Sequence, residues 1–144
     1  MADRLRPQWT VSGVIEADVN RTWNAILNQT EELSGEEKAL LQRPAGECRV
    51  EKTVANGTTE MTIDARQRMI TRQGHWWYRG VTSIEAHPDG ALVSYRVYNI
   101  APGMGWWIAQ LVQERQHAQT MQTSFAQSLN TLGQGLGCRS YILP

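Results

Sequence analysis

The stretch GWWIAQLVQERQHAQTMQTSFAQSLNTL, residues 105–132, decides the fold of this chain. Its apolar residues recur in steps of three, four or seven, which places them on one stripe of a helix with about 3.6 residues per turn. They are Trp107, Leu111, Ala118, Met121, Phe125, Leu129 and Leu132. The opposite side is almost entirely polar, so the stretch predicts one long helix lying on an apolar surface. At about 1.5 Å per residue, this helix spans roughly 42 Å, more than the width of a small domain.

The apolar stripe is interrupted in the first half of this helix. Glu114 falls within the stripe, Arg115 lies beside it, and the next stripe position is only an alanine, Ala118. The second half has side chains typical of a packed core. A helix that seals tightly at one end and loosely at the other predicts a cavity under its first half. Glycines at positions 133, 135 and 137 are expected to end the helix.

Composition limits the class of protein. The length of 144 residues predicts a single domain over residues 1–144. Lys and Arg (14) balance Asp and Glu (14), so no overall field draws the chain to DNA or to an anionic membrane. No segment has the length of a membrane span, and the first residues lack the apolar run of a signal peptide. Cys48 and Cys138 are too few for a disulfide framework, so we expect free thiols in a cytoplasmic protein.

The first third of the chain predicts a strand followed by two short helices. Residues 9–15 alternate between apolar and polar side chains, which is typical of a half-buried strand. Asp18 has the side chain of a helix N-cap and precedes a short amphipathic stretch. Ser34 and Glu37 have the spacing of a capping box, which predicts the start of a second short helix.

From residue 46 onward the hydrophobic period changes to two, which predicts an antiparallel meander. Hairpin signals occur at Asn56-Gly57 and at Pro88-Asp89-Gly90, and one long strand is expected over residues 74–86. Sequential hairpins make an antiparallel sheet, and the long helix is the element expected to cover its dry face. The sequence therefore predicts the α+β class, with six or seven strands, two short helices after the first strand and a long C-terminal helix.

Three stretches carry a resemblance to a known superfamily: VSGVIEADVNRTW (residues 11–23), DARQRMI (residues 64–70) and DGALVSYRV (residues 89–97). They are similar to the opening strand, the acidic cap with its V-x-x-x-W helix start, and the later strands of helix-grip domains. These are the START-like or Bet v 1-like (SRPBCC) domains, which include the polyketide cyclase/dehydrase and lipid-transport families. The resemblance implies a curved sheet wrapped around the long helix, with an apolar ligand cavity between them. Members bind lipids, sterols or polyketides, and some cyclise or dehydrate them.

The more apolar side of each strand is taken to face the helix, and it carries a few polar groups, including Lys52 and Thr82. An apolar pocket with a few placed polar groups is how small-molecule sites are usually built. The candidate ligand-binding residues are Trp76, Tyr78, Tyr95, Val97, Asn99, Trp107, Leu111, Glu114 and Ala118. Glu114 and a tyrosine would orient a ligand carbonyl or hydroxyl, or act as acid and base. The alternative for Glu114 is a wet cavity mouth, paired with Arg115 or with water.

Two further features have both a functional and a structural interpretation. Trp106 and Trp107 follow a Gly/Pro segment and form either a lip that gates a cavity or touches a membrane, or a helix start packed on the sheet edge. A basic cluster over residues 66–79 suggests binding of RNA or of an anionic head group, or else a solvated sheet face. The cluster consists of Arg66, Arg68, Arg72, His75 and Arg79.

The sequence has no metal-ligand spacing, phosphate-binding loop or nucleophile elbow, so we expect no cofactor and no metal. The first hypothesis is a protein that binds an apolar small molecule, such as a lipid or polyketide, between the sheet and the C-terminal helix. The second is a polyketide cyclase or dehydratase using Tyr78, Tyr95 or Glu114. The third is a protein- or RNA-interaction module. We expect no DNA partner and no stable membrane insertion, and the oligomeric state stays open, with a homodimer as one option.

Overall fold

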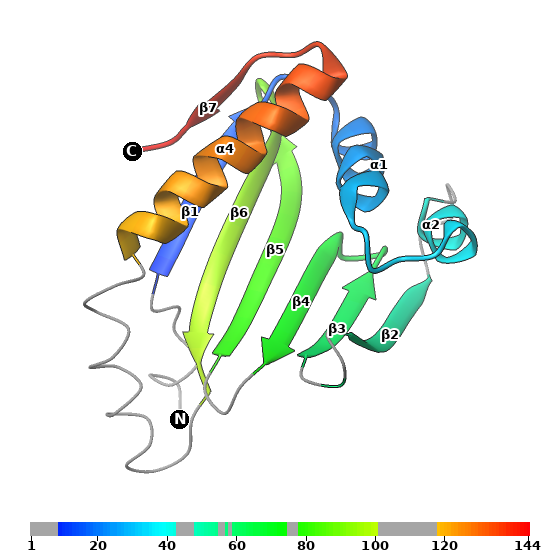
Figure 1. Cartoon of the computed structure of the whole chain (residues 1–144). Helices are drawn as coiled ribbons and strands as arrows, with labels where there is room; N and C mark the ends of the chain where they lie inside the picture. Colours follow the sequence, from blue (N-terminus) through cyan, green and yellow to red (C-terminus); the bar gives the residue numbers. More distant parts are fainter. Residues whose placement is uncertain (1–8, 43–47, 55–56, 58, 75–77, 101–117) are drawn as a thin grey trace.

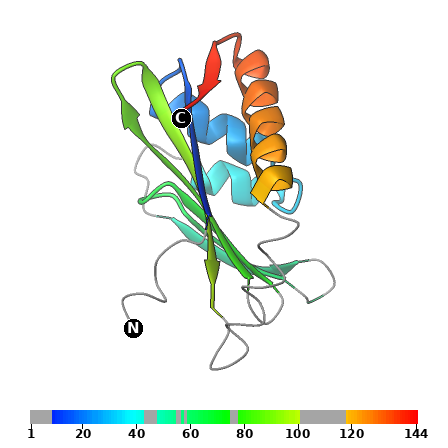
Figure 2. The same ribbon diagram turned by 90° about the vertical axis from the view of Figure 1, so that its left-hand side faces the viewer.

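The computed structural model describes residues 9–42, 48–54, 57, 59–74, 78–100 and 118–144. Within these residues, seven strands form one antiparallel sheet, and three helices lie on the same side of it (Figures 1 and 2). The prediction of an α+β chain with six or seven strands and two short helices after the first strand is confirmed. We call the side of the sheet on which the helices pack the helix face, and the other side the opposite face.

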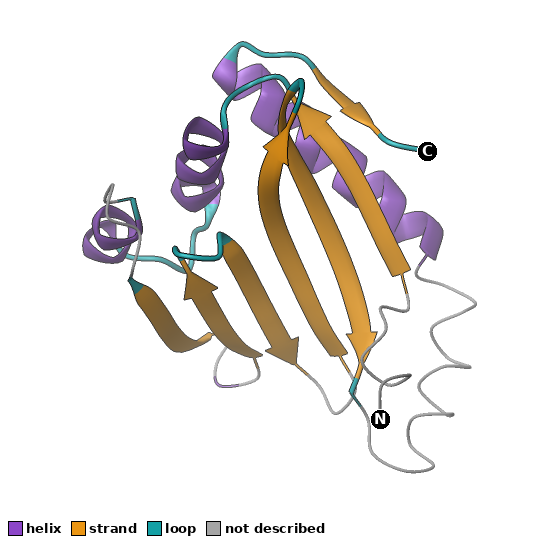
Figure 3. Cartoon of the chain, turned by 180° about the vertical axis from the view of Figure 1, so that it is seen from behind, coloured by secondary structure: helices purple, strands orange, loops and turns teal. Residues whose placement is uncertain are grey.

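The sheet order places the first strand of the chain near the last one. The order is β2-β3-β4-β5-β6-β1-β7, and every neighbouring pair is antiparallel (Figure 3). The helices are α1 (Val19–Gln29), α2 (Gly35–Leu41) and α4 (Ala118–Leu136). The strands are β1 (Trp9–Ile15), β2 (Arg49–Val54), β3 (Thr59–Asp64), β4 (Met69–Gly74), β5 (Tyr78–His87), β6 (Gly90–Asn99) and β7 (Ser140–Ile142).

The two short helices begin where the capping residues predict. The Asp18 side chain accepts a hydrogen bond of 2.8 Å from the backbone N–H of Arg21. Ser34 and Glu37 form the reciprocal pair of a capping box, with the Glu37 N–H donating to Ser34 Oγ and the Ser34 N–H donating to Glu37 Oε1. These bonds satisfy backbone donors that the first helical turn leaves without a partner.

The hydrophobic core lies between the helix face and all three helices, and α4 contributes Leu129 and Leu132 to it. Leu27 of α1 and Ile63 of β3 are fully buried, and Met61 is 1% exposed. The Trp23 indole N–H donates to the backbone oxygen of Leu41 at 3.1 Å, so this large side chain is buried without leaving its donor unpaired. The expectation that the C-terminal helix alone covers the dry face is wrong, because α1 packs on β5 and β6.

Helix α4 packs on β1, β7 and α1, and Gly13 of β1 allows its close approach. A Cβ at Gly13 would overlap the Leu129 Cδ2 atom and would lie 2.9 Å from the Tyr141 backbone oxygen. Leu129 and Leu132 are both buried, as the apolar stripe predicts. The helix therefore seals well against the sheet over its C-terminal half.

The helix ends later than the sequence predicts. Gly133 and Gly135 lie inside α4, and only Gly137, with φ 68°, has the left-handed conformation of a C-terminal cap. The Cys138 N–H donates to the Gly133 oxygen at 2.9 Å and the Gly137 N–H to the Gln134 oxygen at 3.1 Å, which is a Schellman motif. Gly133 is buried in the helix, where an added Cβ would meet the Cys138 oxygen at 3.0 Å, so its role is close packing. The predicted helix start at Gly105 lies outside the described residues.

The start of the strand expected over residues 74–86 is wrong. Gly74 ends β4 and lies opposite Tyr78, where β5 begins, and β5 then continues to His87. Alternation of apolar and polar residues has the same period on both sides of a chain reversal, so it does not locate the reversal. The hairpin predicted at Pro88-Asp89-Gly90 is confirmed, with His87 opposite Gly90.

Candidate functional site

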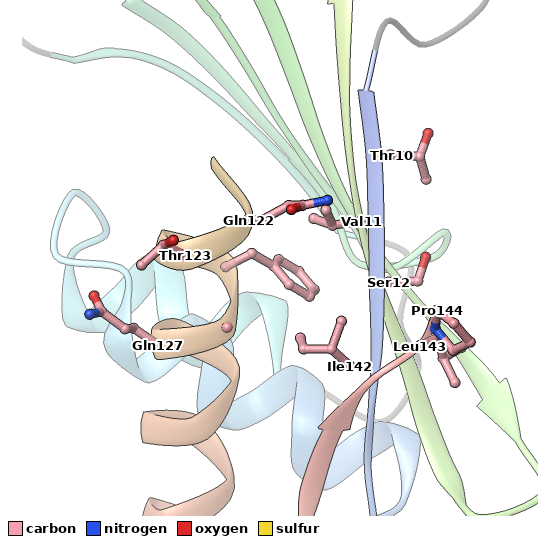
Figure 4. Close-up of a pocket in the computed structure, with 11 residues that line it drawn as sticks. Thr10, Val11, Ser12, Gln122, Thr123, Gln127, Ile142, Leu143 and Pro144 are labelled. Atoms are coloured by element: carbon pink, nitrogen blue, oxygen red, sulfur yellow. The ribbon is translucent and has the colours of Figure 1, made fainter. Parts of the chain in front are cut away.

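A cavity of about 660 Å³ lies between β1, α4 and the C-terminal segment (Figure 4). Six of its lining side chains are apolar, and the other five are uncharged hydroxyls and amides. The lining residues are Thr10, Val11, Ser12, Gln122, Thr123, Phe125, Ala126, Gln127, Ile142, Leu143 and Pro144. The volume falls within the range of about 300–1,000 Å³ that small-molecule sites occupy.

The cavity forms where the contact between α4 and β1 opens. At Gly13 the helix touches the strand through Leu129, but one turn earlier the helix presents Phe125, which is only half-buried, and the small Ala126. Figure 4 shows Gln122 reaching from α4 toward Val11, with Ile142 lying between the helix and β1. The space between these elements is therefore bounded by apolar groups with an amide at one side.

The outer part of the cavity reaches the edge of the sheet. Thr10 and Ser12 alternate with Val11 and project to the opposite face, away from α4 (Figure 4). The Ser12 hydroxyl lies 3.0 Å from the Ser94 hydroxyl of β6, and the Leu143 N–H donates to the Ser12 oxygen at 2.9 Å. The first bond holds the Ser12 side chain to β6, and the second holds the C-terminal segment to the Ser12 backbone.

Two predicted binding residues lie on the helix face of β6, next to β1. Tyr95 is opposite Val11, and Val97, which is 3% exposed, is opposite Trp9. Both therefore share a face with Val11 of the cavity, although neither lines it. Tyr78 and Asn99 are paired across β5 and β6, and Ala118 begins α4, but the structure describes only the backbone of these three residues. Trp76, Trp107, Leu111 and Glu114 lie outside the described residues.

None of the lining residues is among the ligand-binding residues predicted from the sequence. Phe125 packs against the hydrophobic core, as expected, but its side chain is only half-buried and also lines the cavity. The stripe on the helix identifies Phe125 as inward-facing but does not say which part of the sheet it faces. The small Ala126 and the polar Gln122 beside it are the available signal that packing is loose here.

At the other end of the helix face, charged residues are paired. Lys52 lies on the helix face, as predicted, and its ammonium group is 2.8 Å from Glu37 Oε1 and also bonds the Glu32 backbone oxygen. The bond from Lys52, aided by the Ser34 N–H, lowers the pKa of Glu37 from its ordinary value of 4.5. Arg72, opposite Met61 in the register, lies 3.4 Å from Glu32 Oε2. These pairs fasten β2 and β4 to the segment around α2.

The predicted basic cluster does not form one surface. Arg72 of β4 is on the helix face. Arg79 of the neighbouring strand β5 is on the opposite face, with its guanidinium bonded to Gln73 at 3.0 and 3.1 Å. Arg68 has a positive φ of 53° and bonds the Asn20 side chain of α1 at 2.8 Å. Residue spacing alone suggested a cluster, but strand alternation and the β3–β4 turn send these side chains in different directions.

The C-terminal strand is fastened across the opposite face. The Tyr141 hydroxyl bonds Asp89 Oδ2 in the β5–β6 turn at 2.6 Å, and this bond raises the pKa of Tyr141 from its ordinary value of 10.0. Glu16 N–H donates to the Arg139 oxygen at 2.8 Å, which adds a backbone bond beyond the end of β7. The short strand that forms one wall of the cavity is thus held by two distant contacts.

The described part of the chain offers few groups for bond-making chemistry near the cavity. None of its described lining side chains carries a carboxylate, imidazole, thiol or amine. Over the same described ranges, no group of three or more His, Cys, Asp or Glu could hold a metal ion. Among the helices described, none is long and apolar enough to cross a membrane.

Comparison of the sequence with known protein families finds no matching family model. Comparisons with curated proteins and with solved structures also find no significant match. The resemblance to helix-grip domains therefore stays a prediction, and the geometry of the chain itself carries the functional argument.

Proposed function

We propose that this chain is a helix-grip domain that binds an apolar small molecule, such as a lipid or polyketide, beside its C-terminal helix. The observation that carries the proposal is the cavity of about 660 Å³ between β1 and α4, with Val11, Phe125 and Ile142 in its lining. An apolar ligand in this space would remove exposed apolar surface from water, at about 25 cal/mol per Å². The order of strands and helices supports the fold part of the proposal.

Binding accounts for this cavity better than catalysis does. A cyclase or dehydratase requires a group that donates or accepts protons at its working pH. The described lining offers hydroxyls and amides, whose protons do not titrate in that range. The interaction-module alternative loses support, because the arginines expected to form one basic surface point to both sides of the sheet.

Native mass spectrometry of the gently purified protein, followed by organic extraction, tests the proposal. We expect an apolar molecule to copurify, or a supplied lipid mixture to add mass at a ratio of one molecule per chain. A protein that neither carries nor takes up an apolar ligand would overturn the proposal.

A pair of variants on one helix connects ligand uptake to this cavity. Ala126→Trp places a bulky ring in the cavity lining and is expected to reduce uptake about tenfold or more, since it fills the space a ligand needs. Ser128→Trp adds the same ring at an exposed position of α4 outside the lining and is expected to leave uptake unchanged. Equal uptake by all three proteins would show that the ligand binds elsewhere.

A further inference from the structure

The side of α4 that faces β1 changes from polar to apolar along the helix. Leu129, which is 3% exposed, packs against Gly13 of β1, where an added Cβ would overlap the Leu129 Cδ2 atom. Gln122 precedes Leu129 by about two turns of helix, so the two side chains project from the same side of α4. A glutamine therefore occupies a position on the β1-facing stripe where an apolar side chain is expected.

The two glutamines of the described cavity lining point in different directions. Figure 4 shows Gln122 extending from α4 toward Val11, whereas Thr123 and Gln127 lie on the side of the helix away from β1. The helix rotates by about 140° between the two glutamines, which agrees with this difference. Gln122 is itself exposed, so its amide lies at the mouth of the cavity and reaches across it toward the strand.

The other end of the cavity is apolar and lies near the point where the helix meets the strand. Phe125, about one turn after Gln122, lines the cavity and packs against the hydrophobic core. Ile142 lies opposite Gly13 in the β1–β7 register, next to the contact of Leu129 with the strand. The cavity thus leads from an amide at its mouth to apolar side chains near Leu129, over roughly 10 Å of helix.

We propose that the cavity binds an amphiphile in one orientation, with its hydrogen-bonding head group at Gln122 and its hydrocarbon chain against Phe125 and Ile142. The inference rests on the proposed function, and it names the class of ligand and the residue that orients it. A primary amide both donates and accepts hydrogen bonds, so Gln122 can bond a hydroxyl, a carbonyl or a carboxylate. Because this amide lies at the mouth, a head group there keeps part of its hydration, while burial of the chain supplies most of the affinity.

Competition between a fluorescent probe and two chain molecules of equal length tests the role of Gln122. The probe is N-phenylnaphthylamine, and the competitors are decanol, which has a hydroxyl, and chlorodecane, which has no comparable hydrogen-bonding group. Gln122→Met keeps the length of the side chain and removes the amide. We expect it to weaken decanol binding about three- to tenfold and to leave chlorodecane binding within about twofold of the original.

Gln127→Met is the matched control on the same helix. It removes an identical amide from a lining residue that points away from β1, so both competitors are expected to bind within about twofold of the original. Equal weakening of decanol and chlorodecane by Gln122→Met would indicate a changed cavity shape and would overturn the role of the amide. A similar loss of decanol affinity in the two glutamine variants would do the same, since the effect would not depend on the direction of the side chain.

The orientation has a separate test in the unaltered protein. Nuclear Overhauser contacts from bound decanol should connect the methylene next to its hydroxyl with the Gln122 side-chain amide, and its terminal methyl group with Phe125 or Ile142. The reverse pattern, or contacts of each end with both sites, would overturn the inference and leave the proposed function in place. Binding of neither the fluorescent probe nor decanol would overturn the proposed function together with this inference.

Discussion

The two ends of the helix face are built in contrasting ways. Under α1 and α2, large apolar side chains such as Leu27, Leu41 and Met61 are almost completely buried, and the Trp23 indole has a backbone partner. Beside β1, α4 presents a half-buried Phe125, an alanine and a glutamine around a cavity of about 660 Å³. We refer to these regions as the closed end and the open edge. Residue size and polarity along a single face thus separate the part that stabilises the fold from the part that can hold a ligand.

Truncation of one apolar side chain in each region gives the largest expected contrast. Leu27→Ala at the closed end is expected to lower the free energy of unfolding by about 3 kcal/mol, because it leaves a void among fully buried neighbours. Phe125→Ala at the open edge is expected to lower it by only about 1 kcal/mol, since the ring is half-buried and already borders empty space. Urea denaturation measures both values. Equal losses would mean that the open edge is packed as firmly as the closed end.

A glycine substitution tests the seam that bounds the open edge. Gly13→Ala is expected to destabilise the chain by about 2 kcal/mol, because its Cβ would meet Leu129 and the Tyr141 backbone oxygen. Gly135→Ala in the exposed part of α4 is the matched control, with no atom within 4 Å of the added Cβ. It is expected to stabilise the chain by about 0.5–1 kcal/mol through helix propensity. A harmless Gly13→Ala substitution would argue against close contact between α4 and β1.

The smallest expected effects distinguish the two regions by their pH dependence. At the closed end, the pKa of Glu37 is lowered by Lys52, so the carboxylate form favours folding. This contribution is complete above the ordinary value of 4.5 and is lost as the pH falls through the lower value of the folded protein. The protection factors of the α2 amides, which compare measured with intrinsic hydrogen-exchange rates, should therefore fall in acid. Glu37→Gln should remove that dependence on pH.

At the open edge the sign is reversed. The pKa of Tyr141 is raised by its hydrogen bond to Asp89, so the neutral phenol favours the attached state of β7. This contribution is complete below the ordinary value of 10.0 and is lost as the pH rises through the higher value of the folded protein. Exchange measurements at high pH should show lower protection factors for the β7 amides as the pH rises. In Tyr141→Phe these protection factors should not depend on the pH. Acid loosening of β7, or alkaline loosening of α2, would contradict the assignment of these two bonds.

Local sequence signals predicted the elements well and their connections less well. Asp18, Ser34 and Glu37 cap their helices as expected, because capping depends on hydrogen bonds over three residues. The boundaries near Gly74 and Gly133 were wrong, since a glycine can end a strand, pack inside a helix or cap it, according to its neighbours in space. The faces of β1, β3 and β6 were predicted correctly, because alternation fixes which side chains share a side.

The cavity in the described residues is not the one that the sequence predicted. The sequence predicted loose packing only under the first half of the C-terminal helix, most of which lies outside the described residues, so that prediction stays untested. The sequence placed the predicted cavity opposite Glu114, which lies outside the described residues, whereas the described cavity begins at Gln122 and lies against β1. An apolar stripe states that a helix faces something apolar, and it carries no information on which strand lies beneath it.

The amino-acid sequence by itself determined the α+β class, the order of the elements, the helix caps and the side of each strand that faces the helices. These properties depend on residues close together in the chain, so local physical rules are sufficient to find them. Only the tertiary structure decided that β1 lies between β6 and β7, that Arg72 and Arg79 face opposite ways, and that Phe125 borders a cavity. Those properties depend on contacts between residues far apart in the sequence, where many alternative pairings satisfy the same local pattern.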